Sequence, residues 1–422
     1  MNRKQLADGV HLTVLNAEKF KRCRVAIYFI WPSRRESATA EALLPLLMER
    51  SYADCPDMTE LSKRLAALYG ASLSVETTTL GANRILSVSV TGIQDQYALA
   101  GETLSAEYAA IAIGTAFRPY LVNGLFDAEN VAIEKEQLRE QLESEINDKR
   151  GYCLRQARRK FYGDAPEGIE RWGYLEELDA ITPEQVTTAW KNMIATAQME
   201  VMLLGAQQDI VCTSVLDALK QIRRSPIPMA LPHAMPRTAV QSCVQPVDAV
   251  QGKLCLLFTA GEPITGPTLS SLRVATALLG GTATSRLFLN VREKRSLCYY
   301  CAASGVARNG LLCIDSGVEH ANAAAAKEAI LEEFTALQNG PVTEKELDET
   351  KRSLTGALES VGDTPPSLES WSFQEICNGR QSTPQETISE ICAVTAEDVC
   401  AVLKKFTLSV TYLLAKEENA DG

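Results

Sequence analysis

The sequence contains three histidines, and no two of them are spaced as metal ligands. His11 lies in a strand-like N-terminal stretch, His233 in a proline-rich segment, and His320 after a second strand-like stretch. A helical zinc site of the common kind needs two histidines four residues apart. The scarcity of histidine therefore argues against such a site, and a cluster of these three would require long-range folding.

Long apolar runs and basic tracts are also missing. The first thirty residues alternate charged and apolar positions, which predicts neither a signal peptide nor a membrane span. The formal net charge is -11, and an acidic chain without a basic tract is a poor partner for nucleic acid or an anionic membrane. We therefore expect a cytoplasmic protein with no nucleic-acid or membrane partner.

Cysteine is plentiful but scattered. Twelve cysteines lie between Cys23 and Cys400, and without a signal sequence we expect them to be free thiols. One Cys-x-x-Cys occurs, Cys298 and Cys301, in a predicted strand. Side chains alternate along a strand, so residues three apart are expected on opposite faces. We therefore predict no metal or redox role for this pair.

The hydrophobic pattern predicts a mixture of helices and strands. Strands are expected at 10–15, 23–31 and 199–204, with a hairpin at 72–79 and 84–91. Helices are expected at 38–48, 58–68, 97–110 and 127–149, with Pro45 interrupting the first. Thr182 and Gln185 form a capping box at the start of another helix.

The second half of the sequence repeats the first. Glu134-Lys135-Glu136 recurs as Glu344-Lys345-Glu346 at an offset of 210, and residues 177–186 recur as 390–399 at an offset of 213. This predicts an α+β fold of two homologous domains, each a mostly antiparallel sheet with helices packed on one face. A Pro-rich linker, 225–237, would separate a domain at 1–224 from one at 238–422.

The most specific motif runs from Ser285 to Tyr300. It reads Ser-Arg-Leu-Phe, then Val-Arg-Glu-Lys and Leu-x-Tyr. This wording resembles the C-terminal domain signature of the pitrilysin/insulinase family of zinc peptidases, to which mitochondrial processing peptidase belongs. In that family an Arg and a Tyr seven residues apart hydrogen-bond the peptide substrate, so the resemblance implies this role for Arg292 and Tyr299. It also implies that the two domains form half of a clamshell.

Active members of that family carry His-x-x-Glu-His on an early helix, where the histidines bind zinc and the Glu activates water. Here the corresponding stretch reads Leu46-Leu47-Met48-Glu49-Arg50 in one register or Pro45-Leu46-Leu47-Met48-Glu49 in a register shifted by one, and neither contains a histidine. Leu46 offers zinc no donor atom and Arg50 would repel the cation. Glu49 is at most a remnant of the catalytic base. No metal site is therefore expected in this chain.

The family's third zinc ligand comes from a later helix. Its position corresponds to Glu140 or Gln141 in this sequence. The glutamates of this helix are expected to form a solvated face: Glu134, Glu136, Glu140 and Glu143.

A lost zinc motif beside a kept Arg/Tyr signature implies a non-catalytic subunit. It resembles inactive chains of processing peptidases and bacterial chains of the YfmF type, which are associated with elongation factor P modification. We expect pairing with an active zinc-bearing homologue, or a homodimer, and a contribution to peptide binding or processing. Three alternatives stay open: an active zinc metalloendopeptidase with an unorthodox site, a purely structural scaffold subunit, and a peptide-binding module without a peptidase.

Overall fold

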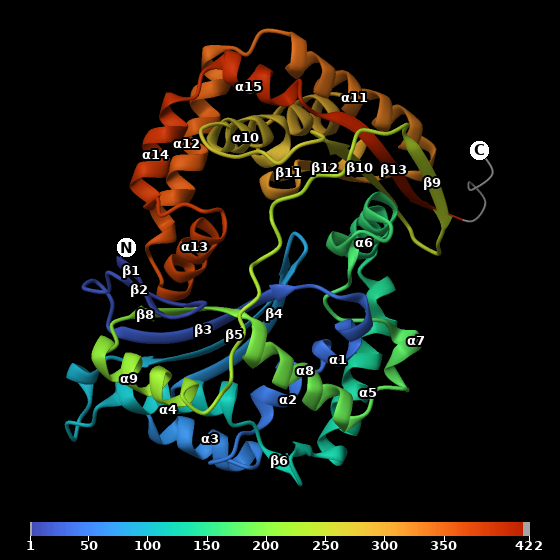
Figure 1. The fold of residues 1–422 in the computed structure, drawn as a ribbon. Helices are drawn as coiled ribbons and strands as arrows, with labels where there is room; N and C mark the ends of the chain where they lie inside the picture. The colour runs from blue at the N-terminus through green and yellow to red at the C-terminus, as the bar shows by residue number, and fades with distance from the viewer. Residues whose placement is uncertain (1, 417–422) are drawn as a thin grey trace. The chain divides into compact units, whose positions relative to one another are not determined.

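A computed structural model describes residues 2–416, which divide into two compact units (Figure 1). Unit 1 comprises Met1–Glu143, Ile169–Leu231 and Asp363–Gln374, and unit 2 comprises Ser144–Gly168, Pro232–Gly362 and Glu375–Gly422. Each unit thus includes one segment from the opposite half of the sequence. The Pro-rich stretch has neither helix nor strand, and the division of the chain into homologous halves on either side of it stays a prediction.

Unit 1 is built on a six-stranded sheet in the order β1-β2-β8-β3-β5-β4. Neighbouring strands are antiparallel except for the parallel pair β2 and β8. The strands are β1 (Asn2–Ala7), β2 (Val10–Leu15), β3 (Arg22–Pro32), β4 (Ser72–Leu80), β5 (Asn83–Ile93) and β8 (Gln198–Leu204). A separate two-stranded ribbon joins β6 (Leu121–Val122) to β7 (Leu125–Phe126).

Unit 2 has a five-stranded sheet in the order β11-β12-β10-β13-β9, again with one parallel pair, β9 and β13. Its strands are β9 (Gln241–Pro246), β10 (Gly252–Thr259), β11 (Cys298–Val306), β12 (Leu311–Val318) and β13 (Thr407–Ala415). In chain order these strands take the places of β2, β3, β4, β5 and β8. The predicted architecture of two like, mostly antiparallel sheets with helices is confirmed.

Helices cover one face of each sheet. In unit 1, Phe29 of β3 meets Phe117 of α4 edge-on at 5.7 Å, and in unit 2 the rings of Phe258 on β10 and Phe334 on α11 lie 4.3 Å apart. The helices of unit 1 besides α13 are α1 (Ala38–Ala42), α2 (Leu44–Arg50), α3 (Met58–Ala67), α4 (Leu104–Phe117), α5 (Ala128–Ser144), α7 (Leu175–Leu178), α8 (Pro183–Thr196) and α9 (Gln208–Leu219). Those of unit 2 besides α6 are α10 (Thr268–Thr276), α11 (Ala323–Asn339), α12 (Glu344–Val361), α14 (Pro384–Ala393) and α15 (Ala396–Leu403), with π-helical stretches η5 (Ala277–Gly281) and η6 (Leu287–Lys294).

One further helix lies on the opposite face of each sheet. In unit 2, α6 (Lys149–Tyr162) buries Cys153 and Phe161 in a cluster with Cys255 and Leu257 of β10. In unit 1, α13 (Pro365–Cys377) stacks Phe373 on Tyr28, with ring centroids 3.8 Å apart. The two segments that each unit takes from the other half of the chain supply these helices.

Several element boundaries differ from the predictions. The helix expected at 127–149 is two helices, α5 and α6, because Asp148 caps α6 by accepting from the Gly151 backbone N–H at 3.0 Å. The helix expected at 97–110 runs from 104 to 117. The helix expected at 38–48 breaks at Leu43, and Pro45 lies in the first turn of α2, where its missing N–H costs nothing. The capping box of Thr182 and Gln185 is confirmed.

One of the sequence matches between the two halves is out of register in the structure. Helices α5 and α12 begin at Ala128 and Glu344, which are 216 positions apart (344 − 128). Lys135 and Lys351 then occupy equivalent positions, and each donates from Nζ to a backbone carbonyl, of Asp179 and Cys392 respectively. Pairing Glu134-Lys135-Glu136 with Glu344-Lys345-Glu346 was therefore wrong by six residues.

None of the helices within residues 2–416 is both long enough and apolar enough to cross a membrane.

Candidate functional site

The position of the lost zinc motif is α2 of unit 1, where Leu44, Pro45, Leu47 and Met48 are buried. Arg50 ends this helix and donates from Nη1 to Glu134 Oε1 at 2.7 Å and from Nε to Asn130 Oδ1 at 3.1 Å. Glu134 lies on α5 and is 3% exposed. A permanently charged guanidinium therefore neutralises a buried carboxylate at this position.

This geometry corrects the expectation for α5. Glu134 is not part of a solvated face, because it is buried and paired with Arg50. Glu140 and Gln141, which were matched to the third zinc ligand, are exposed on the same helix. Glu134 is thus the carboxylate that the fold brings next to the degenerate motif.

The residues at this position do not fit a zinc ion. Leu46 has no donor atom, Arg50 carries a positive charge, and the carboxylate of Glu134 is already engaged. Within residues 2–416 no group of three or more His, Cys, Asp or Glu side chains is arranged to hold a metal ion. Where active relatives have zinc-binding histidines, this chain therefore has Arg50, which forms an ion pair with Glu134.

Glu49 is exposed at the end of α2. Partial desolvation raises its pKa, and the nearby carboxylates of Glu76 and Glu134 act in the same direction, while a hydrogen bond with the Val75 backbone opposes them. Of these two carboxylates, Glu134 forms an ion pair with Arg50 of α2. Glu49 therefore lies near two other carboxylates, and the described residues around it form no group that could hold the metal with which such a catalytic base works.

The retained signature lies in unit 2, on η6 and β11. The Arg292 side chain is 40% exposed, lies over the Phe288 ring at 4.6 Å and has a loose ion pair, 3.6 Å, with Glu293. Tyr299 is 49% exposed, and its hydroxyl donates to Glu319 Oε1 at 3.1 Å, which raises the tyrosine pKa. Both side chains thus reach the surface of their unit with hydrogen-bonding atoms to offer.

A β-bulge explains how Tyr299 comes to the surface. Cys298 pairs with Val318 and Tyr300 pairs with Gly317, so Tyr299 is the extra residue opposite β12. The bulge also shifts the alternation of side chains along β11. Cys298 and Cys301 consequently lie on the same face, and the prediction that they face opposite sides was wrong.

The histidines do not come together. His233 Nδ1 lies 3.0 Å from Glu167 Oε1, and His320 Nε2 lies 3.0 Å from the carbonyl of Ala249. His11 faces Arg3 and Glu200 in unit 1, and its pKa is lowered by burial and then by Arg3. Each histidine thus has local partners of its own.

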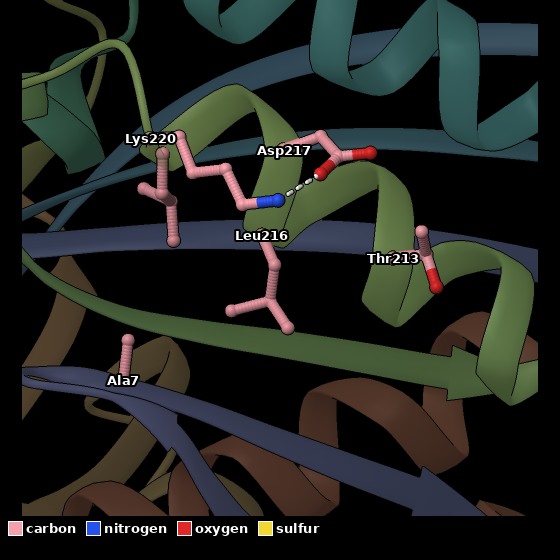
Figure 2. A pocket seen from close by; sticks show the side chains of 6 residues that line it. Ala7, Thr213, Leu216, Asp217 and Lys220 are labelled. Atoms are coloured by element: carbon pink, nitrogen blue, oxygen red, sulfur yellow. Dashed lines mark hydrogen bonds and ion pairs between the residues drawn. The ribbon is translucent and has the colours of Figure 1, made fainter.

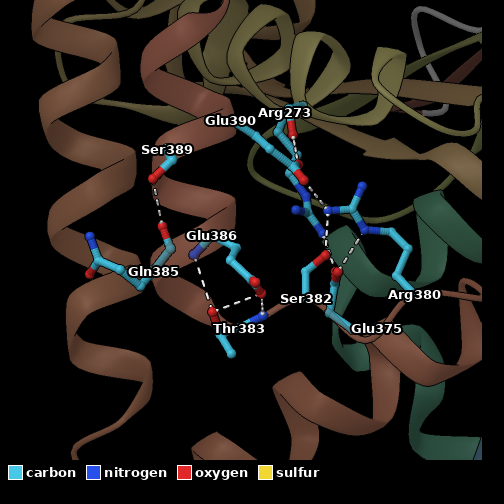
Figure 3. A network of polar contacts seen from close by, with 10 residues as sticks. Arg273, Glu375, Arg380, Ser382, Thr383, Gln385, Glu386, Ser389 and Glu390 are labelled. Carbon is cyan, nitrogen blue, oxygen red and sulfur yellow. Dashed lines mark hydrogen bonds and ion pairs between the residues drawn. The ribbon is translucent and has the colours of Figure 1, made fainter.

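Two hollows lie away from the predicted residues. One, of about 400 Å³, lies between β1 and α9 (Figure 2) and is lined by Ala7, Thr213, Leu216, Asp217, Leu219 and Lys220. The other, of about 460 Å³, adjoins a polar network of unit 2 (Figure 3) in which the buried Glu375 accepts from Arg273 at 2.7 Å and Arg380 at 2.9 Å. Because the charges of this network neutralise one another, we interpret it as structural.

Comparisons with known proteins show which proteins this chain is similar to. Residues 180–354 match the sequence model of the peptidase M16 inactive domain. The chain is 26% identical over 413 residues to the Bacillus subtilis (strain 168) protein named "Probable inactive metalloprotease YmfF", covering 98% of this chain and 97% of that one. The name of this relative is YmfF, so the expected resemblance to a YfmF type carried the wrong name.

Two further proteins are similar to the chain. Over 152 residues it is 32% identical to "Uncharacterized zinc protease YmxG" of Bacillus subtilis (strain 168), covering 35% of this chain and 37% of that one. A crystal structure of a conserved protein from Enterococcus faecalis V583 superimposes with a TM-score of 0.89 at 26% identity, covering 99% of this chain and 98% of that one.

The chain is thus similar to inactive metalloprotease-like proteins of the M16 type. The predicted resemblance to pitrilysin/insulinase-type zinc peptidases is confirmed, as is the prediction that the chain is non-catalytic. The roles of Arg292, Tyr299 and Glu49 stay predictions.

Proposed function

We propose that this chain is the non-catalytic subunit of a peptidase, that it pairs with an active zinc-bearing homologue, and that it contributes to peptide binding through Arg292 and Tyr299. The observation that carries the proposal is the contrast between the two positions. The cation at the former metal position is used internally, whereas the Arg292 and Tyr299 side chains are 40% and 49% exposed.

The chemistry of the pair suits an extended peptide. Arg292 is held over Phe288, so its guanidinium is oriented while keeping donors for backbone carbonyls. The Tyr299 hydroxyl can donate to a peptide carbonyl when it exchanges Glu319 for the ligand. Because neither side chain is buried within its unit, a ligand would gain hydrogen bonds without breaking the core.

Pairing with a homologue is the first part to test. The tagged chain would be isolated from cells that express it naturally, and its stoichiometric partners would be identified by mass spectrometry. We expect a zinc-bearing homologue, and the complex should cleave peptides in a chelator-sensitive way that the isolated chain does not. Recovery of the chain alone or as a homodimer would overturn the heterodimer, and chelator-sensitive cleavage by the isolated chain would overturn the non-catalytic role.

The contribution to binding is tested on the complex with a fluorescent peptide substrate. Arg292→Ala and Tyr299→Phe are each expected to weaken peptide binding about tenfold, as loss of a hydrogen bond worth about 1.4 kcal/mol does. Arg295→Ala is the matched control, because Arg295 lies in the same turn region but pairs with Glu332 at 2.7 Å. Unchanged affinity in the Arg292→Ala/Tyr299→Phe double variant would favour a purely structural scaffold.

A narrower form of the proposal concerns elongation factor P, whose modification the resemblance associates with this bacterial group. Deletion of the gene is expected to change the mass of elongation factor P isolated from the cell. An unchanged mass would remove this link and leave the subunit role to be judged by the pairing experiment.

A further inference from the structure

The edge strand β11 brings two thiols together where a regular strand would separate them. Cys298 pairs with Val318 and Cys301 pairs with Ser316 on β12. Val318 and Ser316 are two residues apart and so point to one face of the sheet, and their partners on β11 do the same. The extra residue of the bulge, Tyr299, is what gives a Cys-x-x-Cys sequence this arrangement.

The spacing of the pair is compatible with a disulfide. Because the two cysteines face residues that are two positions apart, their Cα atoms lie about 6.7 Å from each other at a strand rise of about 3.3–3.4 Å per residue. Disulfides span Cα separations up to about 6.8 Å. The separation lies at the upper end of this range, and the Cβ atoms of a disulfide are only about 3.5–4.5 Å apart, so the edge strand must move to join the two sulfur atoms.

The surroundings distinguish the two thiols. Both interact with each other and with the Ser316 hydroxyl. Cys298 is half-buried, whereas Cys301 is 6% exposed. The pKa of Cys298 is lowered to about 7, first by the hydrogen bond from Cys301 and then by Ser316 and the positive charge of Arg292, while the pKa of Cys301 is raised. Cys298 therefore has comparable amounts of thiol and thiolate at neutral pH, and the thiolate is the reactive form.

We propose that Cys298 and Cys301 form a reversible dithiol–disulfide site, in which Cys298 is the attacking thiol, Cys301 is the resolving thiol, and a small-molecule disulfide such as oxidised glutathione is the oxidant. The site depends on the bulge in β11 and on the shared contact with Ser316. It does not depend on a peptidase partner.

The exchange balances in two steps. The Cys298 thiolate attacks one sulfur of oxidised glutathione, a Cys298–glutathione bond forms, and one glutathione leaves as a thiolate that takes a proton from solvent. Cys301 then loses its proton to solvent and attacks the Cys298 sulfur, which expels the second glutathione. The second glutathione also leaves as a thiolate and takes a proton from solvent. Counted from the dithiol, whose Cys298 proton passes to solvent before the attack, the protein loses two electrons and two protons, and oxidised glutathione becomes two molecules of reduced glutathione.

Unit 2 contains a matched pair that should not react. The sulfur atoms of Cys255 on β10 and Cys313 on β12 lie 3.7 Å apart, yet both side chains are buried. The hydrogen bond between Cys255 and Cys313, together with burial, raises the pKa of Cys255 well above its ordinary value. The two thiols thus interact with each other in both pairs, whereas among these four cysteines only Cys298 is not buried.

The experiment uses the full chain, incubated in its native state with oxidised glutathione, quenched in acid, alkylated and digested with trypsin. Both cysteines fall in the single peptide Ser296–Arg308. We expect this peptide to become lighter by two hydrogen atoms and to lose its alkylation sites, at least ten times faster than Cys255 and Cys313 lose theirs. Reduction with excess dithiothreitol should reverse the change.

Two variants assign the roles. Cys301→Ser is expected to accumulate a stable glutathione adduct on Cys298, and Cys298→Ser is expected to leave Cys301 fully alkylated. A wild-type peptide that stays doubly alkylated, or that oxidises no faster than the Cys255/Cys313 pair, would overturn the proposal without reference to either variant.

Discussion

The motif position on α2 and the Arg292/Tyr299 pair use their charged groups in opposite ways. On α2, the guanidinium of Arg50 forms an ion pair within unit 1 with the buried carboxylate of Glu134. On η6, the guanidinium of Arg292 has a loose partner in the adjacent Glu293 and stays accessible. The comparison shows that the same residue type is structural where it neutralises a buried charge and available for a ligand where it does not.

The largest effect is expected from Arg50→Ala. This change leaves Glu134 buried without its cation, and we expect it to lower the free energy of unfolding by about 3 kcal/mol. Urea unfolding at neutral pH measures the difference. Arg118→Ala is the control, because the exposed ion pair of Arg118 with Asp54 at 2.7 Å should be worth below about 1 kcal/mol. Equal losses in the two variants would mean that the Arg50–Glu134 pair is not the internal support described here.

The second prediction concerns a double substitution that should create a zinc site at α2. Leu46→His/Arg50→His places two histidines four residues apart on α2, beside Glu134. Zinc should then raise the melting temperature, by the equivalent of about 2.7 kcal/mol at a free concentration 100 times the dissociation constant. Leu46→His alone, which keeps Arg50, should show no shift. If zinc stabilises neither variant, Glu134 is not placed as a third ligand.

The third prediction is that Arg292 contributes much less than Arg50 to the stability of the fold. Arg292→Ala should change the free energy of unfolding by less than about 0.5 kcal/mol, as exposed substitutions usually do. The same urea titration as for Arg50→Ala checks this. A loss comparable to that of Arg50→Ala would assign Arg292 to the support of unit 2 and remove the contrast.

The smallest effect concerns Glu49 and pH. Its pKa is raised in the folded chain, so the native state holds this proton more tightly than the unfolded chain, and its contribution to stability falls as pH rises from the ordinary pKa of Glu through the raised one. Glu49→Gln should therefore gain about 0.3 kcal/mol over the wild type at neutral pH, after allowance for solvent screening. The gain should vanish below about pH 3, where both states are protonated. A gain that does not depend on pH would exclude titration of Glu49 as its cause.

Elements governed by neighbouring residues were predictable. The capping box of Thr182 and Gln185 forms within four residues, and β3 and β5 are short runs rich in β-branched and other apolar residues, which favour strands locally. The boundary between α5 and α6 was missed because the charged pattern continues across it, and the cap at Asp148 is a short polar signal within that pattern.

The sequence by itself determined the mixed α/β class, the two like halves, the absence of a histidine pair and the Arg292/Tyr299 spacing, because these are properties of composition, periodicity and order. The tertiary structure alone decided that Glu134 meets Arg50 across 84 positions of sequence, since an ion pair depends on where two helices pack. It also decided that Cys298 and Cys301 share a face, because a bulge arises from pairing with β12 rather than from β11 itself. Interactions between neighbouring residues determine the helices and strands, whereas long-range packing determines which side chains contact one another.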